Sequence, residues 1–383
     1  MIKKRAFKYR LKPTKNQREK FQQFAGVRRW IFNQGLQQRQ KAHQEGKKLT
    51  YYEQNNELIA LKEQFSWLKE VHSQIPQQAL KDLDRAYQHF FRRVKLGTKP
   101  GFPKFKKKGV KDTFRFPQGV RIKGSQAYLP KIGKVKFRKS RELEGILKET
   151  TIIQEGNAWY IVFSCEIELP SPLPAPIDGD KAIGIDMGLK AFATLAIGKS
   201  NIQQEVKNPK YLSKNLSKIK HLSRELSKKA PKSRNRLKAR IRLSKLHAGV
   251  KNSRNDFAQK LSTKMIKNHD IFCIESLEIS RLLTKSPKSL SRSISDASWR
   301  SFLHCLKYKA EEKGKHIVEA GKYFPSTQIC SGCSHLQAMP LDQREYVCPN
   351  CGLKIDRDYN SAIALKAAGM SVLKPVELPL KGS

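Results

Sequence analysis

Apolar and polar positions follow two different periods in the first quarter of the chain. Over residues 3–10, Phe7 and Tyr9 alternate with basic side chains, which predicts a short β-strand. After Thr14, a residue type that often caps helices, apolar positions recur at helical spacing. This spacing is found in three stretches, residues 14–36, 52–72 and 76–95. We therefore predict a helical region over residues 14–95.

Alternation returns between residues 110 and 169, where short apolar–polar runs are separated by turn residues. The last run has the pattern of a hairpin with Glu155-Gly156-Asn157 at its tip. We predict a small antiparallel β-barrel or sandwich that the strand at residues 3–10 joins, so that the helical region is an insertion. The Pro-rich segment ELPSPLPAPIDGD (168–180) is typical of a linker.

After the linker, strand and helix patterns alternate, which predicts an α/β domain. Strands are expected at residues 181–187, 191–197, 271–275 and 316–320, and a helix at residues 296–313. Residues 207–254 are rich in helix formers, with breaks expected near Pro231 and Gly249. The segment between residues 276 and 295 is predicted to be a loop.

Charge changes this picture most. The chain has 77 Lys and Arg against 33 Asp and Glu, a net charge of +44, while 38% hydrophobic residues indicate a globular protein. Such an excess repels itself, and a nucleic acid would offset it. Residues 207–254 alone hold 17 Lys and Arg and the single acid Glu225, more than a solvated helix face needs.

Nothing in the sequence favours a membrane partner. No apolar stretch approaches the ~20 residues of a membrane span, and the N-terminal MIKKRAFKYR lacks the apolar core of a secretory signal. We therefore expect the protein to stay in the cytosol of its cell.

Four of the seven cysteines form two CxxC pairs. Cys330 and Cys333 lie in CSGC, and Cys348 and Cys351 lie in CPNC. Two such turns present four thiolates for one tetrahedral Zn²⁺, and four protein ligands leave no open position for catalysis. A redox CxxC is the alternative, but it would not need two copies. We therefore predict a structural zinc, and buried inert thiols at the other three positions, 165, 273 and 305.

Three acids end or begin predicted elements in the last region. Asp186 lies in GIDMG (184–188), Glu275 ends the apolar run IFCIE, and Asp358 lies in the first turn of a predicted helix. Each alone has an ordinary explanation as a turn, strand-end or helix-start residue. Together they match the carboxylate cluster that two Mg²⁺ ions need for phosphodiester hydrolysis. Two other acids compete, Asp356 and Glu278, and we rank them lower.

The order of these elements fits an RNase H-like α/β fold, in which acids on the first strand, a central strand and the last helix converge. Asp186 would bridge both Mg²⁺ ions, Glu275 would bind one and Asp358 the other. Gly184 and Gly188 are expected to let the backbone approach a phosphate. Asn360 is expected to support the metal ligands by hydrogen bonding to them from outside the metal site.

These motifs, in this order, resemble a known family. GIDMG, IFCIESLE, CSGC–CPNCG and DRDYNSA resemble the TnpB (OrfB) family, the transposon-associated nucleases with a RuvC-like domain that are relatives of the type V CRISPR effectors. YRLKPTKNQ, LKDLDRAYQHFFRRVK and GFPKFKKKG extend the resemblance over residues 3–370. The chain departs from the family pattern mildly, with Tyr346 for a usual Trp and Ser361 for a usual Ala.

The resemblance implies an RNA-guided, Mg²⁺-dependent DNA endonuclease. Such a protein binds a guide RNA from the transposon end, recognises a short motif beside its double-stranded target, and cuts both strands at one RuvC site. One chain with one site is expected to act as a monomer. All three acids are present, so cutting is expected. The alternative is a guided DNA-binding repressor or transposition regulator without cleavage.

The resemblance also implies a domain plan. A wedge-like β-barrel domain would consist of residues 1–13 and 96–169, interrupted by a helical recognition domain at residues 14–95. A linker at residues 170–180 would precede the RuvC-like domain at residues 181–325. A zinc ribbon at residues 326–353, the last RuvC helix at residues 354–370 and a loose tail at residues 371–383 would complete the chain.

Nucleic-acid contacts are expected in two groups. The first group, on the helical region and the first barrel strands, would read the target-adjacent motif: Tyr52, Gln77, Gln78, Lys81 and Thr113. The second group would contact the phosphate backbone: Lys104, Lys106, Arg234, Arg236 and Arg240.

Overall fold

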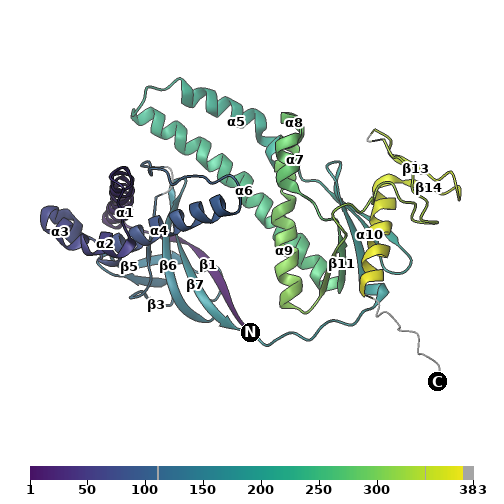
Figure 1. Ribbon diagram of the computed structural model, residues 1–383, viewed down its shortest axis with the longest axis horizontal. Helices are drawn as coiled ribbons and strands as arrows, with labels where there is room; N and C mark the ends of the chain where they lie inside the picture. Colours follow the sequence, from purple (N-terminus) through teal and green to yellow (C-terminus); the bar gives the residue numbers. More distant parts are fainter. Residues whose placement is uncertain (110–111, 341, 374–383) are drawn as a thin grey trace. The chain divides into compact units, whose positions relative to one another are not determined.

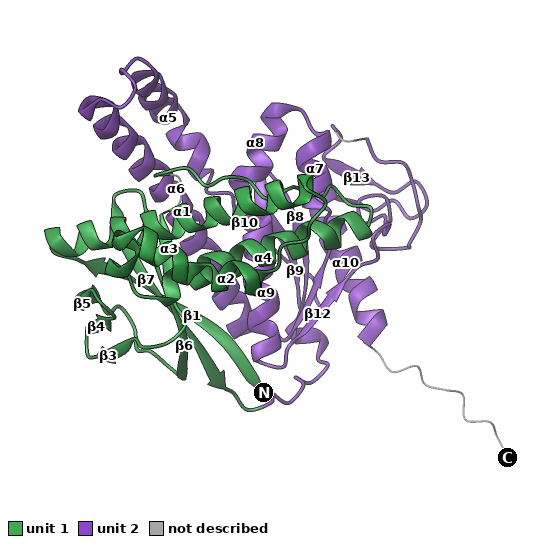
Figure 2. Cartoon of the chain, turned by 60° about the vertical axis from the view of Figure 1, so that its left-hand side comes forward, with its two compact units in different colours: residues 1–170 green, residues 171–383 purple. Residues whose placement is uncertain are grey.

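The computed structural model describes residues 1–109, 112–340 and 342–373. The chain forms two compact units, Met1–Pro170 and Ser171–Ser383 (Figure 2). The predicted loose tail lies outside the described residues from residue 374 onward. Its first three residues are the end of the last helix.

Antiparallel strands form the sheet of the first unit, in the order β2-β6-β7-β1-β5-β4-β3. The strands are β1 (Ile2–Lys12), β2 (Thr113–Phe116), β3 (Arg121–Lys123), β4 (Gln126–Leu129), β5 (Gly133–Arg138), β6 (Ile146–Glu155) and β7 (Ala158–Glu168). β1 lies inside the sheet between β7 and β5, with Phe7 opposite Phe163. Across the part of the first unit that the structure describes, the sheet is open rather than a closed barrel, because its edge strands β2 and β3 each pair on one side only.

The helices of the first unit lie between β1 and β2 in the chain. They are α1 (Lys15–Gln44), α2 (Tyr51–Asn56), α3 (Leu58–Gln64), the 3-10 helix η1 (Ser66–Glu70) and α4 (Gln74–Lys95). The Thr14 side chain accepts a hydrogen bond from the backbone of Gln17 and so caps α1. Phe24 of α1 packs on Phe114 of β2 with ring centroids 5.3 Å apart, so the helices and the sheet share one core.

A mixed sheet forms the centre of the second unit, in the order β10-β9-β8-β11-β12. The strands are β8 (Ala182–Met187), β9 (Ala191–Ile197), β10 (Ile202–Lys207), β11 (Ile271–Ile274) and β12 (His316–Glu319). β9 pairs antiparallel with β8 and β10, whereas β11 pairs parallel with β8 and β12. The sequence did not predict β10, because almost all of its side chains are exposed and give no apolar pattern.

The helices of the second unit depart from the prediction in two places. They are α5 (Tyr211–Ser227), α6 (Arg234–Asn268), α7 (Ile279–Lys285), α8 (Lys288–Ala297), α9 (Trp299–Glu312) and α10 (Arg357–Leu373). α5 and α6 are separated around Pro231 as expected, but α6 continues through Gly249. α7 and α8 replace the loop predicted for residues 276–295. In α8, burial of Ile294 and Ala297 outweighs the weak helix propensity of the serines.

Helices cover both faces of this sheet (Figure 1). Side chains alternate along β8, so Ile183 and Ile185 join the core formed with α6 and α9. Gly184 points the other way, against α10, where a Cβ atom would lie 1.9 Å from the carbonyl oxygen of Ala362. The face of the sheet toward α10 therefore carries Asp186 as well as this closely packed glycine.

Two short strands, β13 (Glu345–Val347) and β14 (Lys354–Asp356), precede α10. They accompany a small core in which the buried ring of Tyr346 packs with Cys330 and Cys348. Within the described residues, no helix has the length and apolar character needed to cross a bilayer.

Candidate active site and cysteine cluster

Asp186 and Glu275 lie on neighbouring strands and on the same face of the sheet. Asp186 is the last but one residue of β8 and is buried, with 8% of its surface exposed. Ile274, the last residue of β11, lies beside Ile185 in the parallel register, so Glu275 follows next to Asp186. Adjacent strands are about 4.8 Å apart, so the two residues are neighbours across the strand pair.

Asp358 reaches the same face from the first turn of α10. The start of this helix is capped by Asp356, whose Oδ1 accepts hydrogen bonds from the backbone of Asp358 and Tyr359, both 3.0 Å long. Asp356 is thus occupied as a helix cap. The other competing acid, Glu278, forms an ion pair with Lys322 at 2.8 Å.

The carboxylates influence one another electrostatically. Burial first, and then the charges of Asp358 and Glu275, raise the pKa of Asp186 to about 7, against the opposing hydrogen bond from Ser361. Burial also raises the pKa of Glu275. A carboxylate with such a pKa, lying beside other acids, disfavours its own charge until a cation is near.

Asp358 pairs with basic side chains in this structure. The guanidinium of Arg357 donates to its Oδ1 at 3.0 and 3.2 Å, and Arg344 lies 3.9 Å from its Oδ2. Among the described residues, the three carboxylates are not drawn together as tightly as the ligands of a single ion, and only the four cysteines are.

We expected Asn360 to hydrogen-bond to the carboxylates of the site, but Ser361 makes that contact and Asn360 binds the cysteine loop. The amide of Asn360 donates to the carbonyl of Ile329 at 2.8 Å and accepts from the backbone N–H of Ser331 at 2.9 Å. The hydroxyl of Ser361 instead donates to Asp186 Oδ1 at 3.0 Å. Ser361 follows Asp358 by three residues, a spacing that puts both on one helix face and could have identified it.

The two glycines of GIDMG also need a different explanation. Gly184 is required by the close approach of α10, and a Cβ at Gly188 would lie 3.0 Å from the carbonyl oxygen of Ala191. Both positions are therefore limited by the protein's own backbone. The sequence pattern alone gives neither the packing of α10 on Gly184 nor the approach of Ala191 to Gly188.

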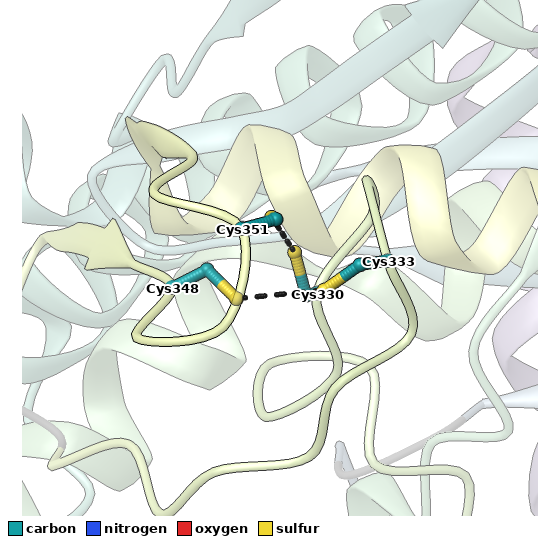
Figure 3. A group of neighbouring side chains, drawn as sticks. All are labelled: Cys330, Cys333, Cys348 and Cys351. Carbon is teal, nitrogen blue, oxygen red and sulfur yellow. Dashed lines mark hydrogen bonds between the residues drawn. The ribbon is translucent and has the colours of Figure 1, made fainter.

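Cys330, Cys333, Cys348 and Cys351 converge, as their spacing predicts (Figure 3). Their sulfur atoms all lie within 4.8 Å of one another, and two pairs are 3.6 Å apart, Cys330 with Cys351 and Cys333 with Cys348. A tetrahedral Zn²⁺ with Zn–S distances of about 2.3 Å requires sulfur separations of about 3.8 Å. The cluster therefore fits zinc.

The pKa values of two thiols in this cluster are shifted in opposite directions. A hydrogen bond from Asn350 and one from the backbone of His335 lower the pKa of Cys333 to about 6. The Leu353 amide favours the thiolate of Cys351, but hydrogen bonds with the other cysteines outweigh it and raise its pKa to about 12. The thiolate of Cys333 therefore forms easily, whereas that of Cys351 is disfavoured. A bound Zn²⁺ would favour both thiolates.

α5 and the N-terminal half of α6 run antiparallel and side by side (Figure 1), and we call residues 207–254 the basic hairpin. Arg234 and Arg240 are exposed on it. Arg236 is used within the hairpin, because its guanidinium donates to the carbonyls of Leu226 and Lys229 at 3.1 and 2.7 Å. It closes the turn between the helices, so we no longer assign it to a phosphate.

A single buried acid fixes the base of the basic hairpin. Asp296 accepts hydrogen bonds from the backbone of Leu212 and Ser213 at 2.7 and 2.9 Å, in the first turn of α5. It also pairs with Arg254 of α6 at 2.9 Å. α5 has no side-chain cap of its own, so Asp296 takes this role from a distant part of the sequence.

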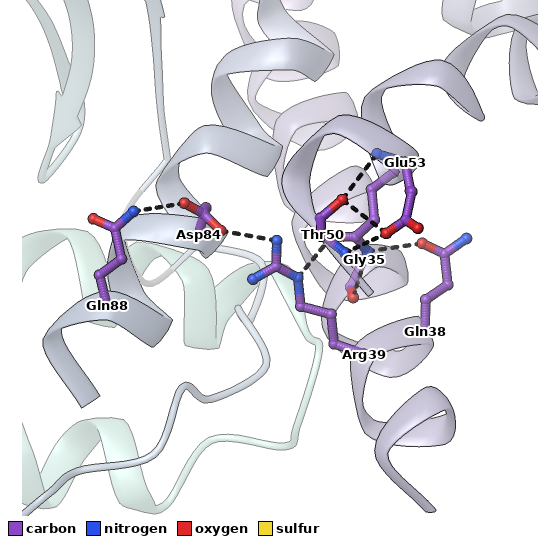
Figure 4. A network of polar contacts seen from close by, with 8 residues as sticks. Gly35, Gln38, Arg39, Thr50, Glu53, Asp84 and Gln88 are labelled. Carbon is purple, nitrogen blue, oxygen red and sulfur yellow. Dashed lines mark hydrogen bonds and ion pairs between the residues drawn. The ribbon is translucent and has the colours of Figure 1, made fainter. Parts of the chain in front are cut away.

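Tyr52 projects from a well-anchored helix in the first unit. It is 76% exposed on α2. The neighbouring Gln54 is buried and donates to the carbonyl of Gly35, while it accepts from Arg39, which in turn pairs with Asp84 of α4 (Figure 4). This network joins α2 to α1 and α4 and leaves the tyrosine ring accessible.

The other residues expected to contact nucleic acid in this unit differ in accessibility. Lys81 and Lys104 are exposed, and Gln77, Gln78, Lys106 and Thr113 are half-buried. Lys106 lies with its ammonium 3.9 Å from the ring centroid of Phe32, and its backbone N–H donates to Asn33. Phe102 and Phe105 are exposed in the same segment, and these aromatic rings were missed by reasoning based on charge alone.

Three models of known protein families match parts of this chain. A family model described as "Probable transposase" matches residues 163–286, one described as "Cas12f1-like, TNB domain" matches residues 299–365, and one described as "Helix-turn-helix domain" matches residues 1–48. In the structure, residues 1–48 hold β1 and the single long helix α1.

Two relatives extend over nearly the whole chain. "Putative RNA-guided DNA endonuclease InsQ" of Escherichia coli K12 is 33% identical over 98% of this chain and 95% of its own length. A protein of Streptomyces pristinaespiralis with the name "Putative RNA-guided DNA endonuclease" is 32% identical over 96% of this chain and 90% of its own. The chain belongs to the TnpB (OrfB) family.

A solved structure shares the fold. The protein in a Cas12f1–sgRNA–target DNA complex superposes with a TM-score of 0.55 at 15% identity, over 91% of this chain and 82% of that chain. At this identity the likeness concerns the fold.

Proposed function

We propose that this protein is an RNA-guided DNA endonuclease of a transposon, which cuts double-stranded DNA beside a short recognised motif. The observation that carries the proposal is the meeting of Asp186, Glu275 and Asp358 on the α10 face of the sheet, with the pKa of Asp186 raised to about 7. Buried carboxylates that repel one another destabilise a fold, and divalent cations would offset that repulsion. The names of the full-length relatives support guided cutting.

The strand order of the second unit supports a RuvC-like nuclease domain. The sheet has three antiparallel strands, β10-β9-β8, followed by β11 and β12, which run parallel to β8, and this order is compatible with an RNase H-like fold. The acids lie on its first strand, after its fourth strand and on its last helix. We regard this domain as the catalytic part of the chain.

In the proposed site these acids would hold two Mg²⁺ ions, with Asp186 shared between them, Glu275 a ligand of one and Asp358 a ligand of the other. Bound ions would activate the attacking water and stabilise the leaving oxygen. Ser361 orients the Asp186 carboxylate through its hydrogen bond to Oδ1. Arg357 balances the charge of Asp358 before ions bind, through its hydrogen bonds of 3.0 and 3.2 Å.

Basic surfaces would hold the nucleic acids. The basic hairpin, with 17 Lys and Arg and one acid, is suited to phosphate contacts, and Arg234 and Arg240 are exposed there. Its proposed partners are a guide RNA from the transposon end and the target DNA. Tyr52 and its neighbours in the first unit are proposed to read the motif, since base pairing with the guide reads the remaining sequence.

The cysteine cluster is proposed to hold one structural Zn²⁺. Four thiolates fill the coordination sphere, so the metal would fix loops and take no part in hydrolysis. The chain, with one carboxylate site and one cluster, is proposed to act as a monomer in the cytoplasm.

The test is cutting of a plasmid by the protein co-expressed with the DNA that flanks the 3′ end of its gene. RNA should co-purify, and cutting should require a target matching that RNA, an adjacent motif drawn from a randomised library, and Mg²⁺. Guided binding without cutting would favour the alternative, a DNA-binding repressor, and cutting without RNA would favour an unguided nuclease.

A further inference from the structure

Two neighbouring residues of α10 reach in different directions. Asn360 binds the loop that carries the first CxxC pair, with hydrogen bonds of 2.8 and 2.9 Å, whereas Ser361 donates to Asp186 at 3.0 Å. The cysteine cluster and the carboxylate site are thus joined through one peptide bond. Neither side chain is exposed to solvent.

The contacts of Asn360 enclose one metal ligand. Its amide nitrogen donates to the carbonyl of Ile329, and its oxygen accepts from the N–H of Ser331, so the residues on both sides of Cys330 are held. Truncation of this side chain would leave the part-buried N–H of Ser331 and C=O of Ile329 without their partner, which is unfavourable for each group. The position of the first CxxC turn therefore depends on α10, and the reverse also holds.

The first turns of α10 have little freedom to absorb a shift. On the sheet side, the carbonyl of Ala362 lies where a side chain of Gly184 would be, so helix and strand are in direct backbone contact. On the other side, the backbone N–H of Arg357 donates to Arg344 at 2.8 Å, in the segment between the two CxxC pairs. A displacement of the cysteine loop would consequently reach Asp358 and Ser361.

We propose that Asn360 is a positioning residue that couples the cysteine cluster to the carboxylate site, so that zinc occupancy sets the placement of Asp358 and Ser361. The coupling to cutting rests on the proposed function. The pair of hydrogen bonds by which Asn360 holds the residues on both sides of Cys330, which we call the clamp, does not rest on the proposed function and can be measured separately.

The first experiment measures zinc retention in the purified protein–RNA complex, as the rate of zinc transfer to a chromophoric chelator. Asn360→Ala should release zinc at least about tenfold faster than the parent protein, as expected when a group supporting a metal ligand is lost. Asn360→Asp keeps the acceptor for Ser331 but loses the donor for Ile329, so its rate should be intermediate. Asn268→Ala, at an exposed position at the end of α6, is the matched control and should equal the parent protein.

The second experiment compares cutting rates with and without zinc, in Mg²⁺, for the parent protein and Asn360→Ala. Zinc removal should slow the parent protein about tenfold or more, while Asn360→Ala should already be slow and lose less than about twofold further. If Asn360 only stabilised the fold, the slowing caused by zinc removal and the slowing caused by Asn360→Ala would simply add.

Zinc release from Asn360→Ala at the parent rate would overturn the clamp. Equal slowing of both proteins on zinc removal would overturn the coupling. If the parent protein cuts no target at all, the proposed function fails, and the release rates still decide whether Asn360 holds the cluster.

Discussion

At the scale of single residues, the chemistry of Asp186 is set by its surroundings. Burial in β8 and the charges of Asp358 and Glu275 raise its pKa, and the Ser361 hydrogen bond opposes the rise. The alternation of β8 and the position of Glu275 after β11 made these acids predictable from sequence. The partner of Asn360 was not predictable, because Ile329 lies 31 residues earlier in the chain, in a loop whose path the local pattern does not define.

The raised pKa of Asp186 predicts a pH-dependent stability in the absence of Mg²⁺. The folded pKa of about 7 exceeds the ordinary value of 3.8, so the folded state binds the proton more tightly. The free energy of unfolding should then fall as pH rises between about 4 and about 7, by up to about 4 kcal/mol. Asp186→Asn cannot ionise and should lose most of this fall, as measured by urea unfolding at pH 5 and pH 8 without added Mg²⁺. Equal pH dependence of both proteins would contradict the assignment.

Ser361→Ala tests the hydrogen bond to Asp186. Its loss should raise the pKa of Asp186 further, because the hydroxyl favours the ionised carboxylate. Protons compete with Mg²⁺, so the acidic limb of the pH–rate profile should move to higher pH. A bond of about 1 kcal/mol corresponds to roughly fivefold slower cutting near neutral pH, with little change at pH 8.5. A profile that keeps its shape would remove Ser361 from the site.

At the scale of elements, the basic hairpin shows how tertiary contacts override local signals. α6 continues through Gly249, although a glycine lowers helix propensity by about 1 kcal/mol, because the helix is packed on both α5 and α9. Asp296 caps α5 from the end of α8, a helix that the sequence did not predict. Apolar periods of 3.6 and 2 residues therefore predicted the buried helices and strands. They did not predict β10, which is exposed, or α8, which is rich in serine.

Charge removal on the basic hairpin should weaken binding and its salt dependence together. The triple variant Arg234→Gln, Lys238→Gln and Arg240→Gln removes three exposed charges. If each contacts a phosphate, the slope of log K against log salt should fall in magnitude by roughly 2–3. The matched control removes Lys264, Lys267 and Lys313, which are exposed outside the hairpin. Identical slopes for the two triple variants, from filter binding to guide RNA across salt concentrations, would show that the hairpin is only a solvated face.

At the scale of the whole molecule, the net charge of +44 and the motif order made the partner class and the family predictable. The four cysteines were predictable as one cluster, because spacing alone defines two CxxC turns. The open edges of the first sheet were not, since the closure of a barrel depends on the pairing of strands far apart in sequence.

The most direct test of the account compares two glutamates three residues apart. Glu275 follows β11 beside Asp186, whereas Glu278 pairs with Lys322. In the guided plasmid-cutting assay with Mg²⁺, Glu275→Gln should slow cutting by at least about a hundredfold, while target binding persists. A loss of this size is typical when one group that stabilises the transition state is removed. Glu278→Gln should cut at the parent rate. Undiminished cutting by Glu275→Gln would contradict the proposed carboxylate site.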